Sequence, residues 1–87
     1  MARSNDAAAD MLQEFADLLA ISGGDPFKVR AYEKAARAVG GYHAEVADLD
    51  EKGLDAIPSV GSHLARKIVE FRDTGSVEEL EIGRAHV

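Results

Sequence analysis

The chain of 87 residues contains no cysteine. For these residues that absence excludes a disulfide bond, a thiol nucleophile and a thiolate metal site. No apolar run approaches the roughly 20 residues of a membrane-spanning helix, and no signal peptide is recognisable. We therefore expect a soluble intracellular protein without a membrane partner. The length suits a single domain with one modest core.

The net charge is −6 at pH 7, which by itself argues against a nucleic-acid partner. The distribution of charge changes that argument. Residues 26–43 carry four bases and one acid, and residues 58–75 carry three bases and two acids. Residues 1–25 and 44–57 each carry five acids and one base. Two interpretations of the basic segments stay open: the solvated faces of ordinary helices, or a nucleic-acid-binding surface.

Helical periodicity begins soon after the N-terminus. Residues 1–5 are expected to be poorly ordered, and Asn5 or Asp6 is expected to cap a first helix that runs to about Ile21. Gly23 and Gly24 end this helix. The apolar positions at helical spacing are Met11, Leu12, Phe15, Leu18 and Leu19, and the acids Asp10, Glu14 and Asp17 lie on the other side.

A second helix is predicted where Asp25 is followed by Pro26, with Asp25 as N-cap and Pro26 in the first helical position. It ends at the pair Gly40–Gly41. The periodicity puts Tyr32 on the apolar side, with Val29, Ala36 and Val39. Another face carries Arg30, Lys34 and Arg37 at spacings of four and three. Three aligned bases suit a strip that follows a nucleic-acid backbone.

A short acidic third helix is predicted from Tyr42 to Glu51, ending near Gly53. Leu54 and Ile57 are assigned to another short helix before a tight turn. His43 lies in a loop, and no special role is predicted for it.

The stretch IPSVGSHLARKIVEF, residues 57–71, combines that turn with a new helix. Gly61 is expected to be the most permissive position of the turn. Leu64, Ala65, Ile68 and Phe71 then follow helical spacing, and Gly75 is the expected C-cap. The first N–H groups of such a helix lack intrahelical partners and suit a phosphate oxygen. A plain turn between two helices is the alternative interpretation.

Two stretches together, DPFKVRAYEKAARAV and IPSVGSHLARKIVEFRDTG, make the chain resemble the N-terminal, lyase-type helix-hairpin-helix domain of family X DNA polymerases, the DNA polymerase beta-like kind of bacteria and archaea. The resemblance covers about residues 5–80. It implies an all-α, compact four-helix domain with one helix-hairpin-helix motif. It also implies a cytoplasmic, nucleoid-associated DNA-repair protein that binds gapped or nicked DNA near a 5′-phosphate and continues into polymerase domains.

The resemblance also implies the site residues. Expected DNA contacts are Lys28, Arg30, Tyr32, Lys34, Arg37, Ser59, Val60, Gly61, Ser62, His63 and Arg66. No cofactor is required, but a monovalent cation, Na⁺ or K⁺, is implied at the hairpin. The backbone carbonyls that would hold it are those of Asp55, Ile57 and Val60. Such a cation would neutralise a DNA phosphate at close range.

In catalytic members of that family, a lysine attacks C1′ of a 5′-deoxyribose phosphate and forms a Schiff base, and β-elimination then releases the sugar. Lys67 matches that lysine. The attack needs a neutral amine, whereas lysine in water is almost wholly protonated at neutral pH. Neighbouring cations and desolvation raise the reactive fraction. Arg66 and His63 are near in sequence, and we expect the Lys67 side chain to project on the side shared by His63 and Glu70.

Several positions depart from the family pattern. Ser59 replaces the first glycine of the hairpin, and Phe27 replaces a phosphate-binding histidine. His63 and Asp55 replace lysines, and Glu79 replaces a base. The nucleophile is thus retained while its anion pocket has fewer charges. Whether the chain is a 5′-deoxyribose phosphate lyase therefore stays open, and no polymerase active site is present in it.

The predicted domain spans residues 1–80. Ser76 and Glu79 have the spacing of a capping box. The last seven residues, EIGRAHV, break the helical pattern and match what a common sequencing adapter would encode, so residues 81–87 are expected to be a non-native or truncated tail. The alternative function is a non-catalytic protein-interaction module that docks through the acidic first and third helices.

Overall fold

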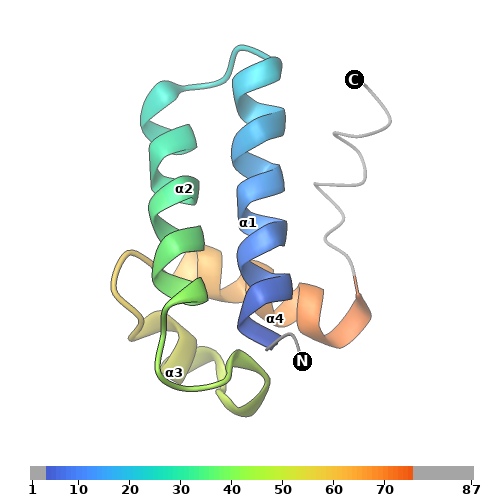
Figure 1. The fold of residues 1–87 in the computed structure, drawn as a ribbon, viewed down its shortest axis with the longest axis vertical. Helices are drawn as coiled ribbons and strands as arrows, with labels where there is room; N and C mark the ends of the chain where they lie inside the picture. Colours follow the sequence, from blue (N-terminus) through green and yellow to red (C-terminus); the bar gives the residue numbers. More distant parts are fainter. Residues whose placement is uncertain (1–3, 76–87) are drawn as a thin grey trace.

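The computed structural model describes residues 4–75, which contain four α-helices, one short 3-10 helix and no strand (Figure 1). The predicted all-α class is confirmed. None of the described helices is both long and apolar enough to cross a lipid bilayer. The elements are α1 (Ser4–Ile21), α2 (Pro26–Gly40), η1 (Val46–Asp48), α3 (Glu51–Asp55) and α4 (Ser62–Thr74).

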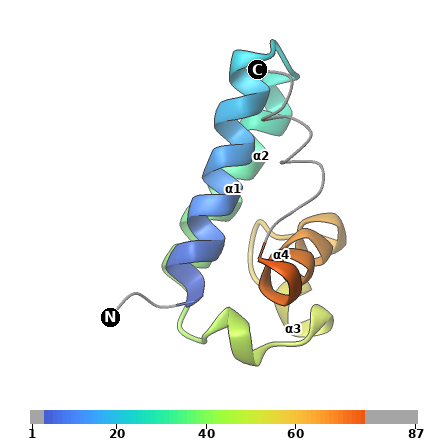
Figure 2. The same cartoon turned by 90° about the vertical axis from the view of Figure 1, so that its right-hand side faces the viewer.

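Helices α1 and α2 form an antiparallel pair (Figure 1). Figure 2 shows α4 beside the lower half of that pair, with the short α3 next to α4. The chain therefore builds two helical hairpins that share one core. The second hairpin joins α3 to α4 and contains the turn that the sequence analysis singled out.

The turn between α1 and α2 follows the prediction. Gly23 takes a positive φ of 77° after α1 ends at Ile21, a conformation that glycine adopts without steric cost. The Asp25 carboxylate accepts a hydrogen bond from the Phe27 amide at 2.9 Å, and Pro26 occupies the first turn of α2. This N-cap and proline fix where the basic helix begins.

The apolar stripes of α1, α2 and α4 meet in the core. Tyr32, Ala36 and Val39 of α2 are buried as predicted, whereas Val29 is half-buried. Phe15 stacks on Tyr32 with ring centroids 5.1 Å apart and an interplanar angle of 7°. The buried apolar residues of the described chain also include Met11, Leu12, Val46, Leu54, Ile57, Val60, Leu64, Ala65 and Ile68.

The capping role predicted for Asn5 or Asp6 is wrong, and so is the expected disorder at Ser4 and Asn5. Both residues lie within α1, and Asn5 is completely buried. Its amide nitrogen donates to the carbonyls of Val39 (3.0 Å) and Ala44 (2.8 Å), and its amide oxygen accepts from the Val46 amide at 2.8 Å. An asparagine that would suit a cap instead satisfies backbone groups of a distant loop.

The predicted third helix over Tyr42–Glu51 is also wrong. This segment is a loop with only one 3-10 turn, and α3 begins at Glu51 and includes Gly53. The Asn5 side chain makes hydrogen bonds to backbone groups of this segment that would be paired within the segment if it were a helix. The Asp50 carboxylate accepts a hydrogen bond from the Gly53 amide at 2.8 Å and so caps α3.

Arg72 of α4 holds the same loop from the other side. Its guanidinium donates to the carbonyls of Val46, at 3.1 Å, and Leu49. Gly75 ends α4 with φ 81°, and its amide donates to the Phe71 carbonyl at 2.8 Å, which confirms the predicted C-cap. The predicted capping box at Ser76 and Glu79 and the tail 81–87 lie outside the described residues.

Candidate nucleic-acid interface

The hairpin between α3 and α4 is a tight turn over residues 57–60. The Val60 amide donates to the Ile57 carbonyl at 3.0 Å. Pro58 and Ser59 occupy the central positions, and Ser59 takes φ 71°, the pattern of a type II turn. Ile57 lies after the end of α3 and is buried, so it belongs to the turn and not to the predicted short helix.

Gly61 plays a different part from the one predicted. Its φ of −92° and ψ of −179° are extended backbone that any residue adopts, so the special conformation belongs to Ser59. A Cβ atom added at Gly61 would meet nothing within 4 Å. Neither the backbone nor the packing of the described chain therefore requires glycine here. The absent side chain leaves the approach to the start of α4 open.

The N-terminus of α4 lacks a side-chain cap. Among the three α-helices whose N-cap residue the structure describes, α2 and α3 are capped by Asp25 and Asp50, whereas Gly61 makes no such bond. The first backbone amides of α4 therefore have no side-chain partner, and the partial positive charge of the helix dipole lies at this end of the helix. Gly61, next to these amides, is exposed to solvent. Ser62 and His63, the first two helical residues, are exposed as well.

The basic stripe of α2 is solvent-exposed as predicted. Arg30, Lys34 and Arg37 are all exposed. The Arg30 guanidinium lies 5.9 Å from the centroid of the Phe27 ring, and Phe27 itself is 75% exposed. An exposed cation over an exposed aromatic ring is a modest stabilising contact. The stripe can therefore reach a polyanion without disturbing the core.

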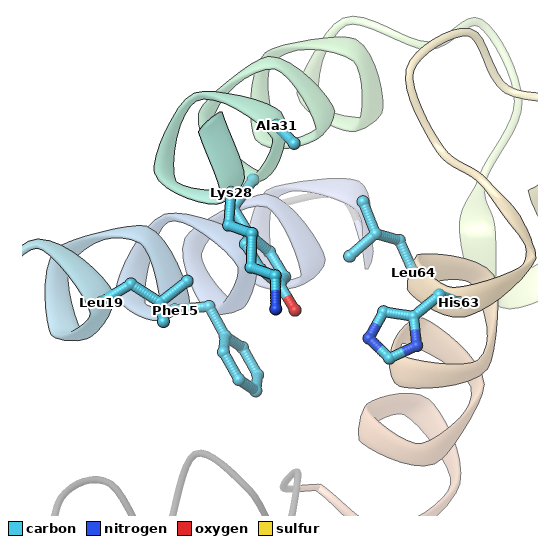
Figure 3. A pocket seen from close by; sticks show the side chains of 7 residues that line it. Phe15, Leu19, Lys28, Ala31, His63 and Leu64 are labelled. Carbon is cyan, nitrogen blue, oxygen red and sulfur yellow. The ribbon is translucent and has the colours of Figure 1, made fainter. Parts of the chain in front are cut away.

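A pocket of about 380 Å³ opens between α1, α2 and α4. Lys28 from α2 and His63 from α4 point toward the same space within it (Figure 3). Apolar groups make up most of the remaining wall, and buried Tyr32 also lines it. The residues that line the pocket are Phe15, Leu19, Lys28, Ala31, Tyr32, His63 and Leu64.

Lys67 is buried, with only 5% of its surface exposed, although it is a charged residue. Its Nζ lies 4.8 Å from the centroid of the Phe15 ring, and Phe15 is also a wall of the pocket. The exposed residues His63 and Glu70 lie one turn to either side of it along α4. Lys67 therefore lies against a wall of the pocket and does not itself line it.

Arg66, by contrast, points away into solvent. Its Nε lies 3.7 Å from a carboxylate oxygen of Glu51 on α3, and its side chain is 78% exposed. Such an exposed pair contributes little to stability. Arg72 is one of the three bases of residues 58–75. Its guanidinium bonds to loop carbonyls, so its role is to hold the loop in place.

Two features of this site were not predicted from the sequence. Phe15 was assigned to the core stripe, which gave no reason to expect it in a pocket wall. Lys67 was expected near exposed neighbours, and its burial follows from the long aliphatic stem of lysine, which can pack on apolar groups. No group of three His, Cys, Asp or Glu side chains within residues 4–75 is arranged to hold a metal ion.

The acidic docking surface of the alternative function loses one of its two elements, because the third helix expected over residues 42–51 does not form. Of the acids expected on the outer side of α1, Asp10 and Asp17 are exposed and Glu14 is half-buried.

The comparison with known proteins agrees with the hairpin geometry. A family model described as a helix-hairpin-helix domain matches residues 3–77, which is most of the chain. No curated protein matches the sequence.

Proposed function

Since the chain belongs to the helix-hairpin-helix domain family, a family of DNA-binding domains, we propose that it binds gapped or nicked DNA near a 5′-phosphate, as the DNA-binding part of a repair polymerase related to family X. The observation that carries this proposal is the uncapped start of α4 beside Gly61, whose side-chain space is open. Backbone amides at a helix N-terminus bind phosphate without reading base sequence. The exposed bases of α2 supply further phosphate contacts.

Substitution of Gly61 tests the proposal. Gly61→Val places a side chain where the phosphate would approach, and Gly61→Ser adds a hydroxyl that can cap the α4 amides itself. We expect both to weaken binding to a 5′-phosphorylated gapped duplex about tenfold, a loss of the size of one charge-assisted hydrogen bond. Fluorescence anisotropy measures the affinity.

Thermal unfolding provides the control, because a Cβ at Gly61 touches nothing in the described chain and both variants should remain folded. Unchanged affinity in a folded variant would exclude the hairpin as the DNA contact. It would then favour the rival interpretation, a protein-interaction module.

A monovalent cation, Na⁺ or K⁺, is proposed at the same hairpin, held by the carbonyls of Asp55, Ile57 and Val60. The Ile57 carbonyl uses one lone pair for the Val60 amide and keeps a second for a cation. A bound cation would add positive charge beside the phosphate. DNA affinity that stays the same when K⁺ is replaced by a tetraalkylammonium ion, at equal ionic strength, would exclude this site.

The proposal also includes lyase activity, with Lys67 as the nucleophile. The amine would attack C1′ of a 5′-deoxyribose phosphate and release water to form an imine. Loss of a proton from C2′ would then break the C3′–O bond, so that the phosphate of the downstream strand leaves, and water would finally hydrolyse the imine and free Lys67. In its support, the fold removes Lys67 from water and places its Nζ against Phe15, a wall of the pocket that Lys28 and His63 enter. The amine is therefore held beside the pocket and away from bulk water before DNA binds.

Borohydride trapping on a pre-incised abasic duplex tests this step. We expect a weak adduct that increases between pH 7 and pH 9 and is lost in Lys67→Ala and in Lys67→Met, while DNA binding changes little. Methionine keeps the aliphatic packing on Phe15, so it separates the loss of the amine from the loss of packing. Lys52→Ala, which removes an exposed base of α3 outside the expected DNA contacts, is the control and should still trap. An equal adduct in wild type and Lys67→Met, or none at any pH, would leave DNA binding alone.

A further inference from the structure

The pocket between α1, α2 and α4 has one fixed cation and one titratable base aimed into it. Lys28 enters from α2 and His63 from α4 (Figure 3). Both residues are exposed, so an anion can reach them from solvent. The helix α1 contributes only Phe15 and Leu19 to the walls, and neither carries a charge.

The remaining charged groups near His63 lie on α4 itself or behind a wall. Lys67, one turn along α4, is buried against Phe15, and Arg66 faces Glu51 on the outer side. Glu70 lies two turns along α4 and is exposed. Tyr32 contributes a hydroxyl group that is uncharged at neutral pH. Within the described lining, a proton on His63 therefore raises the formal charge of the pocket from +1 to +2.

Histidine is the side chain whose charge ordinarily changes between pH 5 and pH 8. We propose that His63 makes the affinity of this pocket for a terminal phosphate depend on pH, with tighter binding below neutrality. This inference rests on the proposed function and adds a regulation to it. The ligand class is a phosphate monoester, which carries up to two negative charges, whereas an internal phosphodiester carries one. The terminal group therefore gains more from the additional positive charge.

The experiment compares two gapped duplexes that differ only in a 5′-phosphate or a 5′-hydroxyl at the gap. Anisotropy gives the ratio of their affinities at steps from pH 6 to pH 8. The phosphate itself has an ionisation near pH 6. In the free duplex that ionisation is the same for every protein variant, so its contribution cancels when the wild-type ratio is divided by the ratio for His63→Gln. We expect this quotient to rise roughly threefold to fivefold as the pH falls, the size of an exposed charge pair.

Two further variants sharpen the test. His63→Lys carries a fixed charge and should keep a high ratio at every pH. His43→Gln is the matched control, because His43 is exposed in the loop after α2 and stacks on Tyr42. It should retain the wild-type pH dependence.

A quotient that stays flat while the wild type binds gapped DNA would overturn the inference and leave the proposed function standing. A pH dependence that disappears in His43→Gln instead of His63→Gln would overturn it as well. Absence of gapped-DNA binding at every pH would overturn the proposed function together with this inference.

Discussion

Ser59 is the residue with the least usual backbone in the described chain. It is the one described residue other than glycine with a positive φ, and in that conformation the Cβ atom of serine crowds the backbone by roughly 1 kcal/mol or more. The position of this strain follows from the type II turn, which needs a positive φ directly after Pro58. Ser59 stands where the family resemblance implies a glycine. Its positive φ explains why, because glycine adopts this conformation without steric cost.

Ser59→Gly is expected to raise the free energy of unfolding by about 0.5 kcal/mol, because relief of strain exceeds the greater entropy of glycine in the unfolded chain. DNA affinity should rise modestly, by at most about 1 kcal/mol, because the turn becomes easier to hold in its bound form. Urea unfolding and anisotropy give the two quantities. Ser59→Ala is the control, since it keeps the strain and removes the hydroxyl. Weaker DNA binding in both variants would show that the hydroxyl contacts DNA.

Among the elements, the helices with strong local sequence features were predicted and the segment held by tertiary contacts was not. Asp25, Pro26 and the glycine pair after Val39 define α2 within the sequence itself. The loop before α3 is defined by Asn5 and Arg72, which lie some 40 residues before it and 25 after it. No pattern along residues 42–51 reveals those partners. The burial of Lys67 was not predicted for the same reason, because it depends on Phe15 of another helix.

Asn5→Ala is expected to destabilise the fold by about 2 kcal/mol. It removes three hydrogen bonds, and the buried amide of Val46 loses the acceptor to which it donates. The loop carries α3 and therefore the hairpin, so DNA affinity should fall as well. Gln13→Ala is the matched control on the same helix, because its amide bonds to Asp17 at the surface. Equal urea midpoints for the two variants would contradict the role given to Asn5.

At the scale of the whole molecule, a chain with a net charge of −6 concentrates its bases in residues 26–43 and 58–75. The exposed bases of α2 and the uncapped end of α4 lie on two of the three helices that line the pocket. Most of the described acids lie on α1 and in the segment before the hairpin. This segregation along the chain lets an acidic protein contact a polyanion through its basic segments, while the acids disfavour other orientations.

The salt dependence of DNA binding measures how many DNA phosphates the protein neutralises. Removal of one base that pairs with a phosphate should reduce the slope of log affinity against log salt by about 0.9 for duplex DNA, because fewer counterions are released. We expect Lys34→Gln and Arg37→Gln to lower the slope by about this amount each. Lys52→Gln, an exposed base of α3 among acids, should leave it unchanged. If Lys52→Gln lowered the slope as much as the α2 variants do, binding would depend on total charge, and the basic stripe of α2 would not be the DNA-binding surface.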